Sequence, residues 1–248
     1  MKLKSISSAA ISTALLLGSL NANATPVEYF GEDLSPGASI PVSGDSEAAR
    51  NAFLSQLTGV GIEDFEAIPA GSTAPLNLTF PGSSSSITAT LNGTGGVCST
   101  SSGTVGGIGC GNGRFPTSGD QYYHTSSAGF EIEFSTGISA FGFYGTDIGD
   151  FNGQLTATTA GGAVEVFNIA HTQNAPNGSL LFWGFIDKET SYTTLTFSNT
   201  GSSNDIFGFD DLIIGDIGQI VAVPEPAGLA LLGAGLLGFG LSRKRKSA

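Results

Sequence analysis

The chain has 248 residues, including 37 glycines, 17 phenylalanines and one methionine, and this composition argues against a helical bundle. Between Glu28 and Asp216, 20 acidic residues stand against three basic ones, Arg50, Arg114 and Lys188, which leaves this part of the chain a net charge of −17. Nucleic acid is excluded as a partner, because phosphate contacts require lysine and arginine.

Residues 1–24 have the layout of a secretory signal peptide. Lys2 and Lys4 form the charged start, residues 9–20 are mostly apolar, and Ala22-Asn23-Ala24 gives the small-x-small cleavage pattern before Thr25. The alternative is an N-terminal helix of the mature fold. A signal peptide predicts export into an oxidising compartment.

The next segment, residues 25–60, is predicted to be largely irregular with one short helix. Pro and Gly spacing up to residue 43 leaves room for at most one short strand. Asp45 or Ser46 can cap a helix that runs to about Leu57. Its apolar face would consist of Ala49, Phe53 and Leu57.

From residue 61 to 217, apolar residues recur with a period of two and predict a single antiparallel β-sandwich. The run Phe130-Glu131-Ile132-Glu133-Phe134 is typical, with the apolar side chains facing a core and the glutamates facing water. The predicted strands are Ile62–Ile68, Leu76–Phe80, Ser86–Leu91, Phe130–Phe134, Ile138–Tyr144, Gln154–Thr159, Ala163–Ile169, Leu180–Ile186, Tyr192–Ser198 and Ile206–Ile214.

Both cysteines, Cys98 and Cys110, lie in a long insertion rich in Gly, Ser and Thr between residues 92 and 122. In an exported protein with two cysteines, a disulfide between them is the favoured interpretation. Two free thiols are the alternative. A metal site is a weaker hypothesis, because no third or fourth soft ligand lies near in the sequence.

Motifs of catalysis are missing from the sequence: it has no GxSxG, no HExxH, no Walker loop and no GxGxxG after a strand. The two histidines, His124 and His171, are interpreted as solvated loop residues. Acid–base chemistry by paired carboxylates stays open, since acidic residues are plentiful.

Aromatic side chains that could stack on a sugar ring are sought among Tyr122, Tyr123 and Trp183. Trp183 lies in a nearly continuous apolar run, which favours a place in the core. Tyr122 and Tyr123 are adjacent at the end of the insertion, so at least one ring is expected to be exposed. They are therefore the candidate ligand-binding residues.

The last stretch of the chain has three parts: Val223-Pro224-Glu225-Pro226, an apolar run over residues 227–241, and a basic cluster. The cluster consists of Arg243, Lys244, Arg245 and Lys246. As a helix the apolar run would be about 22 Å long, short of a hydrocarbon core of about 30 Å. Basic side chains can snorkel to make up part of the difference. This layout predicts a membrane tether with the basic cluster in the cytoplasm, and a buried core helix is the alternative.

These three parts resemble the PEP-CTERM sorting signal of Gram-negative bacteria, which is also catalogued as an "ice-binding protein C-terminal" motif. The resemblance implies that an exosortase, a membrane protease, recognises the tail and cuts near Pro224-Glu225-Pro226. It implies anchoring at the inner membrane before processing, and then a place at the cell surface or in the extracellular matrix.

A looser resemblance covers the middle of the chain. The segments 63–66, 141–147, 181–187 and 207–212 are similar to a recurring group of PEP-CTERM ectodomains, which share a pattern with jelly-roll carbohydrate-binding modules. The fold implied is all-β: an antiparallel jelly-roll-like β-sandwich with one short N-terminal helix and a separate C-terminal hydrophobic helix.

The same resemblance implies a structural Ca²⁺ site. In such modules, a Glu after a Phe near the first strand and an Asp on the last strand commonly bind Ca²⁺, and Glu66, Asp210 and Asp211 hold the matching positions. Period two would put Asp211 on the face of Phe207 and Phe209, which requires a cation or a bulge. A second candidate is the oxygen-rich turn of residues 147–153, and a solvated acidic rim is the alternative to both sites.

Two classes of function follow from these patterns. The first is a non-enzymatic, exosortase-sorted protein of the cell surface or matrix that binds glycans. The second is a secreted polysaccharide-active enzyme on a jelly-roll scaffold. Ice binding is discounted, because no regular Thr-x-Thr ladder spans the domain.

Overall fold

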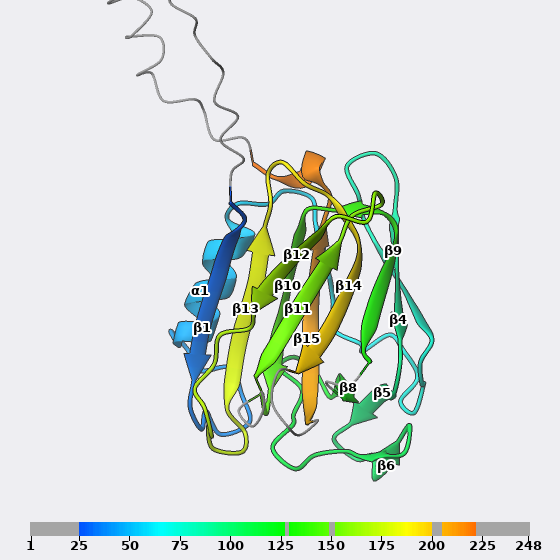
Figure 1. Cartoon of the computed structure of the whole chain (residues 1–248). Helices are drawn as coiled ribbons and strands as arrows, with labels where there is room; N and C mark the ends of the chain where they lie inside the picture. The colour runs from blue at the N-terminus through cyan, green and yellow to red at the C-terminus, as the bar shows by residue number, and fades with distance from the viewer. Residues whose placement is uncertain (1–24, 127–128, 149–151, 200–204, 222–248) are drawn as a thin grey trace, which may run out of the picture.

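The computed structural model describes residues 25–126, 129–148, 152–199 and 205–221. These residues form two antiparallel β-sheets packed face to face, with a small hairpin and one α-helix outside them (Figure 1). The predicted all-β antiparallel sandwich with one short N-terminal helix is confirmed. The predicted signal peptide and C-terminal hydrophobic helix lie outside the described residues.

The first sheet has seven strands in the order β1-β13-β10-β15-β8-β5, with β2 also paired to β15. These strands are β1 (Val27–Asp33), β2 (Gly61–Glu63), β5 (Gly95–Ser99), β8 (Gln121–Ser126), β10 (Ala140–Thr146), β13 (Leu180–Ile186) and β15 (Ile206–Gly215). The hairpin consists of β6 (Thr104–Val105) and β7 (Ile108–Gly109).

The second sheet has six strands in the order β12-β11-β14-β9-β4-β3. These strands are β3 (Leu76–Phe80), β4 (Ile87–Asn92), β9 (Glu131–Ile138), β11 (Gly153–Thr158), β12 (Val164–Asn168) and β14 (Tyr192–Asn199). The helices are α1 (Asp45–Leu54) and the short 3-10 helix η1 (Ile217–Gln219).

Strands β8 to β15 follow a jelly-roll path. β8 pairs with β15, β9 with β14, β10 with β13 and β11 with β12, all antiparallel. Each of the first four strands is thus paired with one of the last four in reverse order, as in an antiparallel ribbon rolled into two sheets. β1, β3, β4 and β5 extend the two sheets beyond this ribbon.

Each predicted strand overlaps an observed one, but the first is much shorter than expected. β2 ends at Glu63, because the Glu63 carboxylate accepts the N–H of Phe65 at 2.8 Å and Phe65 adopts a φ of 60°. The sequence patterns missed the four strands β5 to β8, and they allowed one short strand before residue 43, where β1 lies. β1 lies in the segment expected to be irregular, where it forms the edge of the first sheet.

Phenylalanine fills much of the space between the sheets. The Phe143 and Phe209 rings lie 4.8 Å apart between centroids, and Phe167 stacks on Phe185 at 4.5 Å. Trp183 is fully buried among them, as the apolar run around it predicts. The two sheets therefore share one aromatic core.

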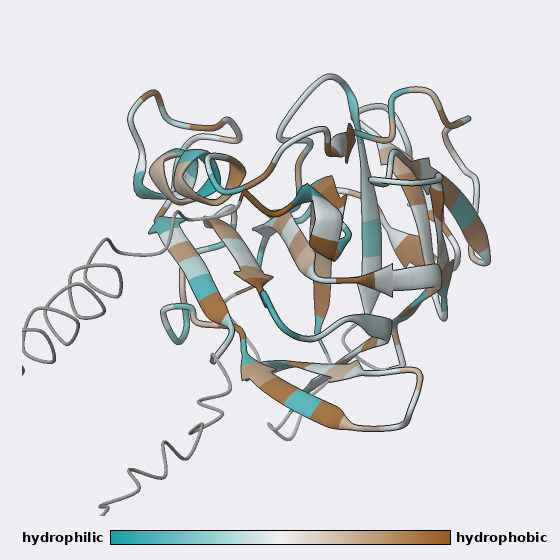
Figure 2. Cartoon of the chain, turned by 90° about the horizontal axis from the view of Figure 1, so that it is seen from above, coloured by the Kyte–Doolittle hydropathy of each residue, from teal (hydrophilic) through white to brown (hydrophobic). Residues whose placement is uncertain are grey.

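Helix α1 packs on the outside of the first sheet, where Figure 2 shows it nearly end-on. Its first turn is held by Asp33 at the end of β1, which accepts the N–H groups of Asp45 and Ser46 at 3.0 Å each. The residue before the helix is Gly44, so the predicted cap by Asp45 or Ser46 is wrong. Phe53 enters the sheet surface at Gly184, where an added Cβ would lie 3.2 Å from its ring.

Candidate functional site

Over five of its six strands, the outward surface of the second sheet is lined by hydrogen-bonding side chains, whereas β12 presents the exposed Val164 and Val166 on the same face. Alternation along β11 and β14 buries Leu155 and Leu195 and turns Thr156 and Thr196 outward. We call this surface the polar sheet face. Its residues are Asn77, Thr79, Thr88, Thr90, Asn92, Glu131, Glu133, Gln154, Thr156, Thr158, Thr194, Thr196 and Ser198.

Strand register aligns these side chains in rows across the sheet. In one row, Asn92 lies opposite Glu131, Glu131 opposite Thr196, and Thr196 opposite Thr156. Within it the Thr196 hydroxyl donates to the Glu131 carboxylate at 3.3 Å. The next row runs through Asn77, Thr90, Glu133, Thr194 and Thr158. The face is thus a continuous array of donors and acceptors over five strands.

The threonines of β11 and β14 form a two-by-two array within this face, with Thr156 opposite Thr196 and Thr158 opposite Thr194. The neighbouring strand β9 carries Glu131 and Glu133 at the matching positions, so carboxylates interrupt the array.

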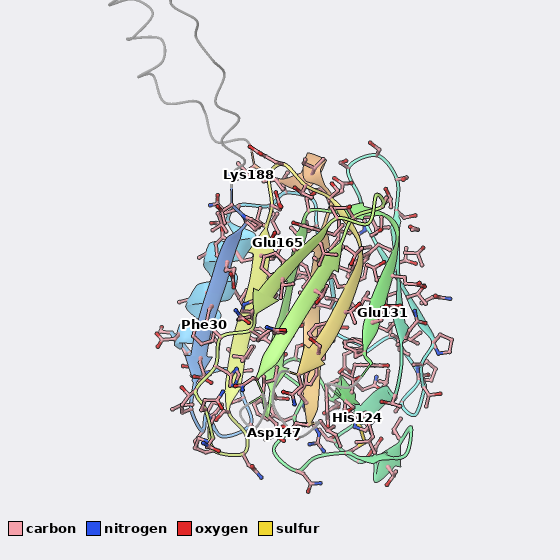
Figure 3. All side chains as sticks on the ribbon, in the orientation of Figure 1. Phe30, His124, Glu131, Asp147, Glu165 and Lys188 are labelled. Carbon is pink, nitrogen blue, oxygen red and sulfur yellow. A yellow bond between two sulfur atoms is a disulfide. The ribbon has the colours of Figure 1, made fainter. Side chains whose placement is uncertain are left out.

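An open pocket of about 440 Å³ adjoins the β12 edge of this sheet. We call it the end pocket. Its lining residues are Thr25, Thr159, Ala163, Val164, Glu165, Asp187, Glu189, Thr190 and Tyr192. The buried Asp187 shapes one wall, since it accepts the N–H groups of Glu189 and Thr190 at 2.9 Å each and the Tyr192 hydroxyl at 2.8 Å. Figure 3 labels Glu165 on β12 and Glu131 on β9 of the same sheet.

The predicted calcium ligands Asp210 and Asp211 lie on β15, at a bulge. The β10–β15 register shifts between Gly142 and Tyr144, and Asp211 adopts a φ of 47°. Strict alternation would place Asp211 on the core face with Phe207 and Phe209. The bulge interrupts this alternation, so neither carboxylate has to point into the core. β2 pairs with β15, so the first and last strands of the predicted sandwich are neighbours, as a calcium site shared between them would require.

Glu66, Asp210 and Asp211 all bind one loop, residues 117–121. Thr117 donates its N–H to the Asp210 carboxylate at 2.7 Å, and the Ser118 hydroxyl donates to Asp211 at 2.9 Å. The Glu66 carboxylate accepts the N–H groups of residues 120 and 121 at 2.7 and 2.6 Å. The three carboxylates therefore hold a loop of the insertion against β15 and the turn after β2.

The ligand atoms of these three carboxylates do not all lie within 4.8 Å of one another. Among the described residues, the one group of three His, Cys, Asp or Glu side chains with ligand atoms within 4.8 Å of one another is Cys98, Cys110 and His124. In the second calcium candidate, residues 149–151 lie outside the described residues. Its Asp147 pairs with the Arg114 guanidinium at 3.2 Å.

Burial governs the charge state of the acids on β15. Burial is the main cause, and together with the negative charge of Asp211 it raises the pKa of Asp210 to about 8, although the hydrogen bonds from Thr117 act in the opposite direction. Burial also raises the pKa of Asp211 and of Glu63. Asp210 therefore holds its proton at neutral pH.

The expectation that a Tyr122 or Tyr123 ring is exposed is wrong. Both rings are buried in β8, because this strand is covered on both sides. Tyr123 faces the core between Phe65 and Phe130, at 5.7 and 5.8 Å between ring centroids. The β6–β7 hairpin covers Tyr122. The Gly-rich insertion is therefore not an open loop, and the two tyrosines form no sugar-stacking platform.

His124 is also buried, so its interpretation as a solvated loop residue is wrong. Its run of aromatic and β-branched neighbours, Gln121-Tyr122-Tyr123-His124-Thr125, is the sequence signal that could have predicted a strand. His171 lies after β12 as expected, half-buried, with its Nδ1–H donated to the Ile169 carbonyl at 2.9 Å.

The predicted disulfide between Cys98 and Cys110 is confirmed. It closes over the outer face of β5 and β8, where Cys98 lies opposite Tyr122. His124 Nδ1 is 3.1 Å from Cys98 Sγ, and Nε2 donates to the Val105 carbonyl at 2.9 Å. Burial lowers the pKa of His124, which favours the neutral imidazole.

Comparison with known families gives one finding for the tail. Residues 222–246 match the family described as the PEP-CTERM protein-sorting motif. The chain carries a PEP-CTERM motif. The motif indicates an exported protein that is sorted to the cell surface by an exosortase. It covers a tenth of the sequence and lies outside the described residues. The motif therefore indicates where the protein is sorted, and it identifies no functional site.

Comparison of the fold returned a chain described as TmCBM61 in complex with beta-1,4-galactotriose. The two share 13% identity over 61% of this chain and 93% of that chain, with a TM-score of 0.27. A likeness of that size carries no argument about the PEP-CTERM protein. No curated protein matches the chain. In the part of the chain that the structure describes, no helix has the length and apolar character needed to cross a membrane.

Proposed function

We propose that this chain is a non-catalytic protein of the cell surface or extracellular matrix that binds neutral polysaccharide. The binding site is the polar sheet face together with the end pocket. The observation that carries the proposal is the array of aligned hydroxyl, amide and carboxylate groups over five strands. The PEP-CTERM motif supports this proposal, because it indicates sorting to the cell surface, where such polymers occur.

The chemistry of the face suits sugar hydroxyls. Each hydroxyl of a glycan donates and accepts, and the face offers carboxylate acceptors such as Glu131 beside threonine hydroxyls and amides. Charge selects the class of polymer, because a domain with 20 acidic and three basic residues repels anionic chains. Neutral polysaccharide is therefore the expected ligand.

The mode of binding follows from the aromatic residues. Among the described residues, Phe30 on β1 is the one strongly exposed aromatic, and it belongs to the other sheet. Figure 3 labels it at the left edge of the view, with Glu131 toward the right. Affinity must then come from hydrogen bonds, each contributing about 0.5–1.5 kcal/mol net. Repeated sugar units along a polymer compensate for weak single contacts through multivalency.

The first steps after export are part of the proposal. Residues 227–241 anchor the protein in the inner membrane, with Arg243 to Lys246 on the cytoplasmic side. An exosortase then cuts near Pro224-Glu225-Pro226. The ectodomain is thereby delivered to the surface of a Gram-negative cell.

The competing function is a polysaccharide-active enzyme. A general acid needs a raised pKa within a cleft. The described carboxyl groups with raised pKa values are Glu63, Asp210 and Asp211. None of them lines the end pocket, and none lines either of two further pockets whose walls include Arg114. This separation favours binding without catalysis.

The test is retention of the purified exported protein on insoluble neutral polysaccharides. The double variant Thr156→Val, Thr196→Val removes two hydroxyls from the face at nearly constant shape, and about tenfold weaker retention is expected from two lost hydrogen bonds. The matched control is Thr104→Val at the exposed residue of β6, and this variant should bind normally. No retention on any neutral polymer would refute glycan binding, and release of reducing ends would establish the enzyme instead.

A further inference from the structure

We propose that Cys98, Cys110 and His124 form a zinc-binding site when the disulfide between the two cysteines is reduced. This inference is independent of the glycan-binding face, which lies on the other sheet. The ligand class is a borderline-soft divalent cation, for which two thiolates and an imidazole are preferred ligands.

The fold brings the three ligands together from separate elements. Cys98 and His124 lie on the paired strands β5 and β8, where Cys98 is opposite Tyr122 and His124 is opposite Gly96. Period two keeps Cys98, Tyr122 and His124 on the same outer face. Cys110 follows β7 and folds back over this face. One ligand atom from each of the three lies within 4.8 Å of the others.

The tautomer of His124 leaves the correct nitrogen free. Its Nε2 is 2.9 Å from the Val105 carbonyl oxygen, which can only accept, so Nε2 carries the proton. Nδ1 therefore presents its lone pair, and it points at Cys98 Sγ at 3.1 Å. A ring N–H donated to a backbone carbonyl is the usual outer partner of a metal-binding histidine.

Small movements convert this cluster into a tetrahedral site. Zn–S and Zn–N bonds of about 2.3 and 2.0 Å place neighbouring ligand atoms about 3.5–3.8 Å apart. The Cys98 Sγ to His124 Nδ1 distance is already near this range. Once the S–S bond is open, rotation of the half-buried Cys110 side chain separates the sulfurs. Gly111 and Gly113, both at positive φ, follow Cys110 in the loop.

A fourth ligand and the reductant can reach the site from solvent. Cys110 lines a pocket of about 220 Å³ with Ser99, Gly111 and Tyr122 among its walls. A water molecule in this pocket completes the coordination, as in sites with three protein ligands. Cys98 itself is fully buried, so attack by a reductant occurs at Cys110.

The reaction balances with a small thiol or a dithiol reductase as the reductant. Two thiol groups of the reductant give up two electrons and become a disulfide, while the Cys98–Cys110 bond breaks and two protein thiols form. Zn²⁺ then displaces the two thiol protons to solvent and binds the thiolates and His124 Nδ1. The cluster is thus either a disulfide or a zinc thiolate.

The test uses the full exported protein, reduced with a phosphine and freed of reductant under anaerobic conditions. After incubation with Zn²⁺ and gel filtration, elemental analysis should find about one zinc per reduced chain and none per oxidised chain. Co²⁺ as a substitute probe should give thiolate-to-metal charge-transfer absorption. His124→Gln should weaken zinc affinity by more than the tenfold to 100-fold cost of losing an outer partner.

Controls separate a metal ligand from a structural histidine. His171→Gln removes the other imidazole of the chain and should bind zinc as the original does. Cys110→Ser changes a half-buried loop residue and should also lose zinc, with near-UV circular dichroism reporting whether the fold persists. The proposal is overturned if the reduced protein binds no zinc, or if folded His124→Gln and Cys110→Ser variants bind it as tightly as the original.

Discussion

Asp210 on the last strand accepts two hydrogen bonds from Thr117, which lies 93 residues earlier: one from its N–H at 2.7 Å and one from its hydroxyl at 2.9 Å. The pair ties the Gly-rich insertion to the centre of the seven-stranded sheet. Because Asp210 is almost fully buried and next to Asp211, its pKa is raised to about 8. The contact between Asp210 and Thr117 that holds the insertion therefore includes a carboxyl group whose pKa is shifted into the neutral range.

We expect the stability of the domain to fall as pH rises from about 4 to about 8 through Asp210. The folded state keeps the proton up to about pH 8, whereas the unfolded chain releases it near the ordinary value of 3.8. The folded state therefore binds more protons in this window, and the stabilisation present at low pH is lost as pH rises through the folded pKa. The total change is on the order of a few kcal/mol.

Thermal melts of the original protein and of Asp210→Asn at several pH values between 5 and 8 measure this effect. The variant should have a flatter dependence of Tm on pH. Asp120→Asn changes an exposed acid in the same loop and should leave the slope unchanged. Equal slopes for the original and Asp210→Asn would show that Asp210 does not hold the proton.

Chelation of divalent cations should leave the melting temperature unchanged. The carboxylates of Glu66, Asp210 and Asp211 accept hydrogen bonds from N–H and hydroxyl groups of loop 117–121. Their oxygen atoms do not form a group within 4.8 Å of one another. Glu66→Gln should lower stability by about 1 kcal/mol with or without Ca²⁺, because it weakens charge-assisted hydrogen bonds. A Tm that rises with Ca²⁺ in the original protein and not in Glu66→Gln would restore the predicted site.

Sequence patterns found the sandwich because its core positions repeat with a period of two. Glu131 and Glu133 alternate with Ile132 and Phe134 as expected, and the structure buries the apolar pair. The jelly-roll resemblance was confirmed by the pairing of β8 with β15 and its successors. These features depend on local alternation, which a single sequence displays.

The candidate site was less accessible to sequence reasoning, because it depends on which strands become neighbours. Tyr122 and Tyr123 occupy opposite faces of β8, and both faces are covered by segments distant in sequence. The closeness of His124 to Cys98 likewise requires the β5–β8 pairing. The polar sheet face was hidden for the same reason, since Thr156 and Thr196 become neighbours only through the β11–β14 register.

Gly184→Ala should destabilise the domain by about 1–3 kcal/mol, since overpacking a filled site forces neighbours apart. An added Cβ would lie 2.8 Å from the Phe141 carbonyl oxygen and 3.2 Å from the Phe53 ring of α1. Gly161→Ala is the matched control, with its nearest neighbour, the Thr159 hydroxyl, 3.9 Å away. Urea unfolding compares the two, and equal midpoints would show that α1 adjusts without cost.

Replacing Arg243, Lys244, Arg245 and Lys246 with serine should release intact protein into the periplasm. In the proposed anchoring, the apolar run is short for a full span, so the basic cluster would be needed to stop transfer and to hold the tail at the cytoplasmic surface. Each basic residue near an anionic leaflet contributes about 1 kcal/mol of attraction. The family match over residues 222–246 includes this cluster, so the same change should also reduce exosortase processing.

Cell fractionation with an alkaline wash measures release, and mass spectrometry of the envelope-derived protein fixes both of its ends. In the original protein, a C-terminus near Pro224-Glu225-Pro226 and an N-terminus at Thr25 are expected. As a control, serine at Lys2 and Lys4 alters charge at the other end and should leave the C-terminal cut in any exported protein unchanged. A tail variant that resists the wash as firmly as the original protein would show that the apolar run anchors without its basic cluster.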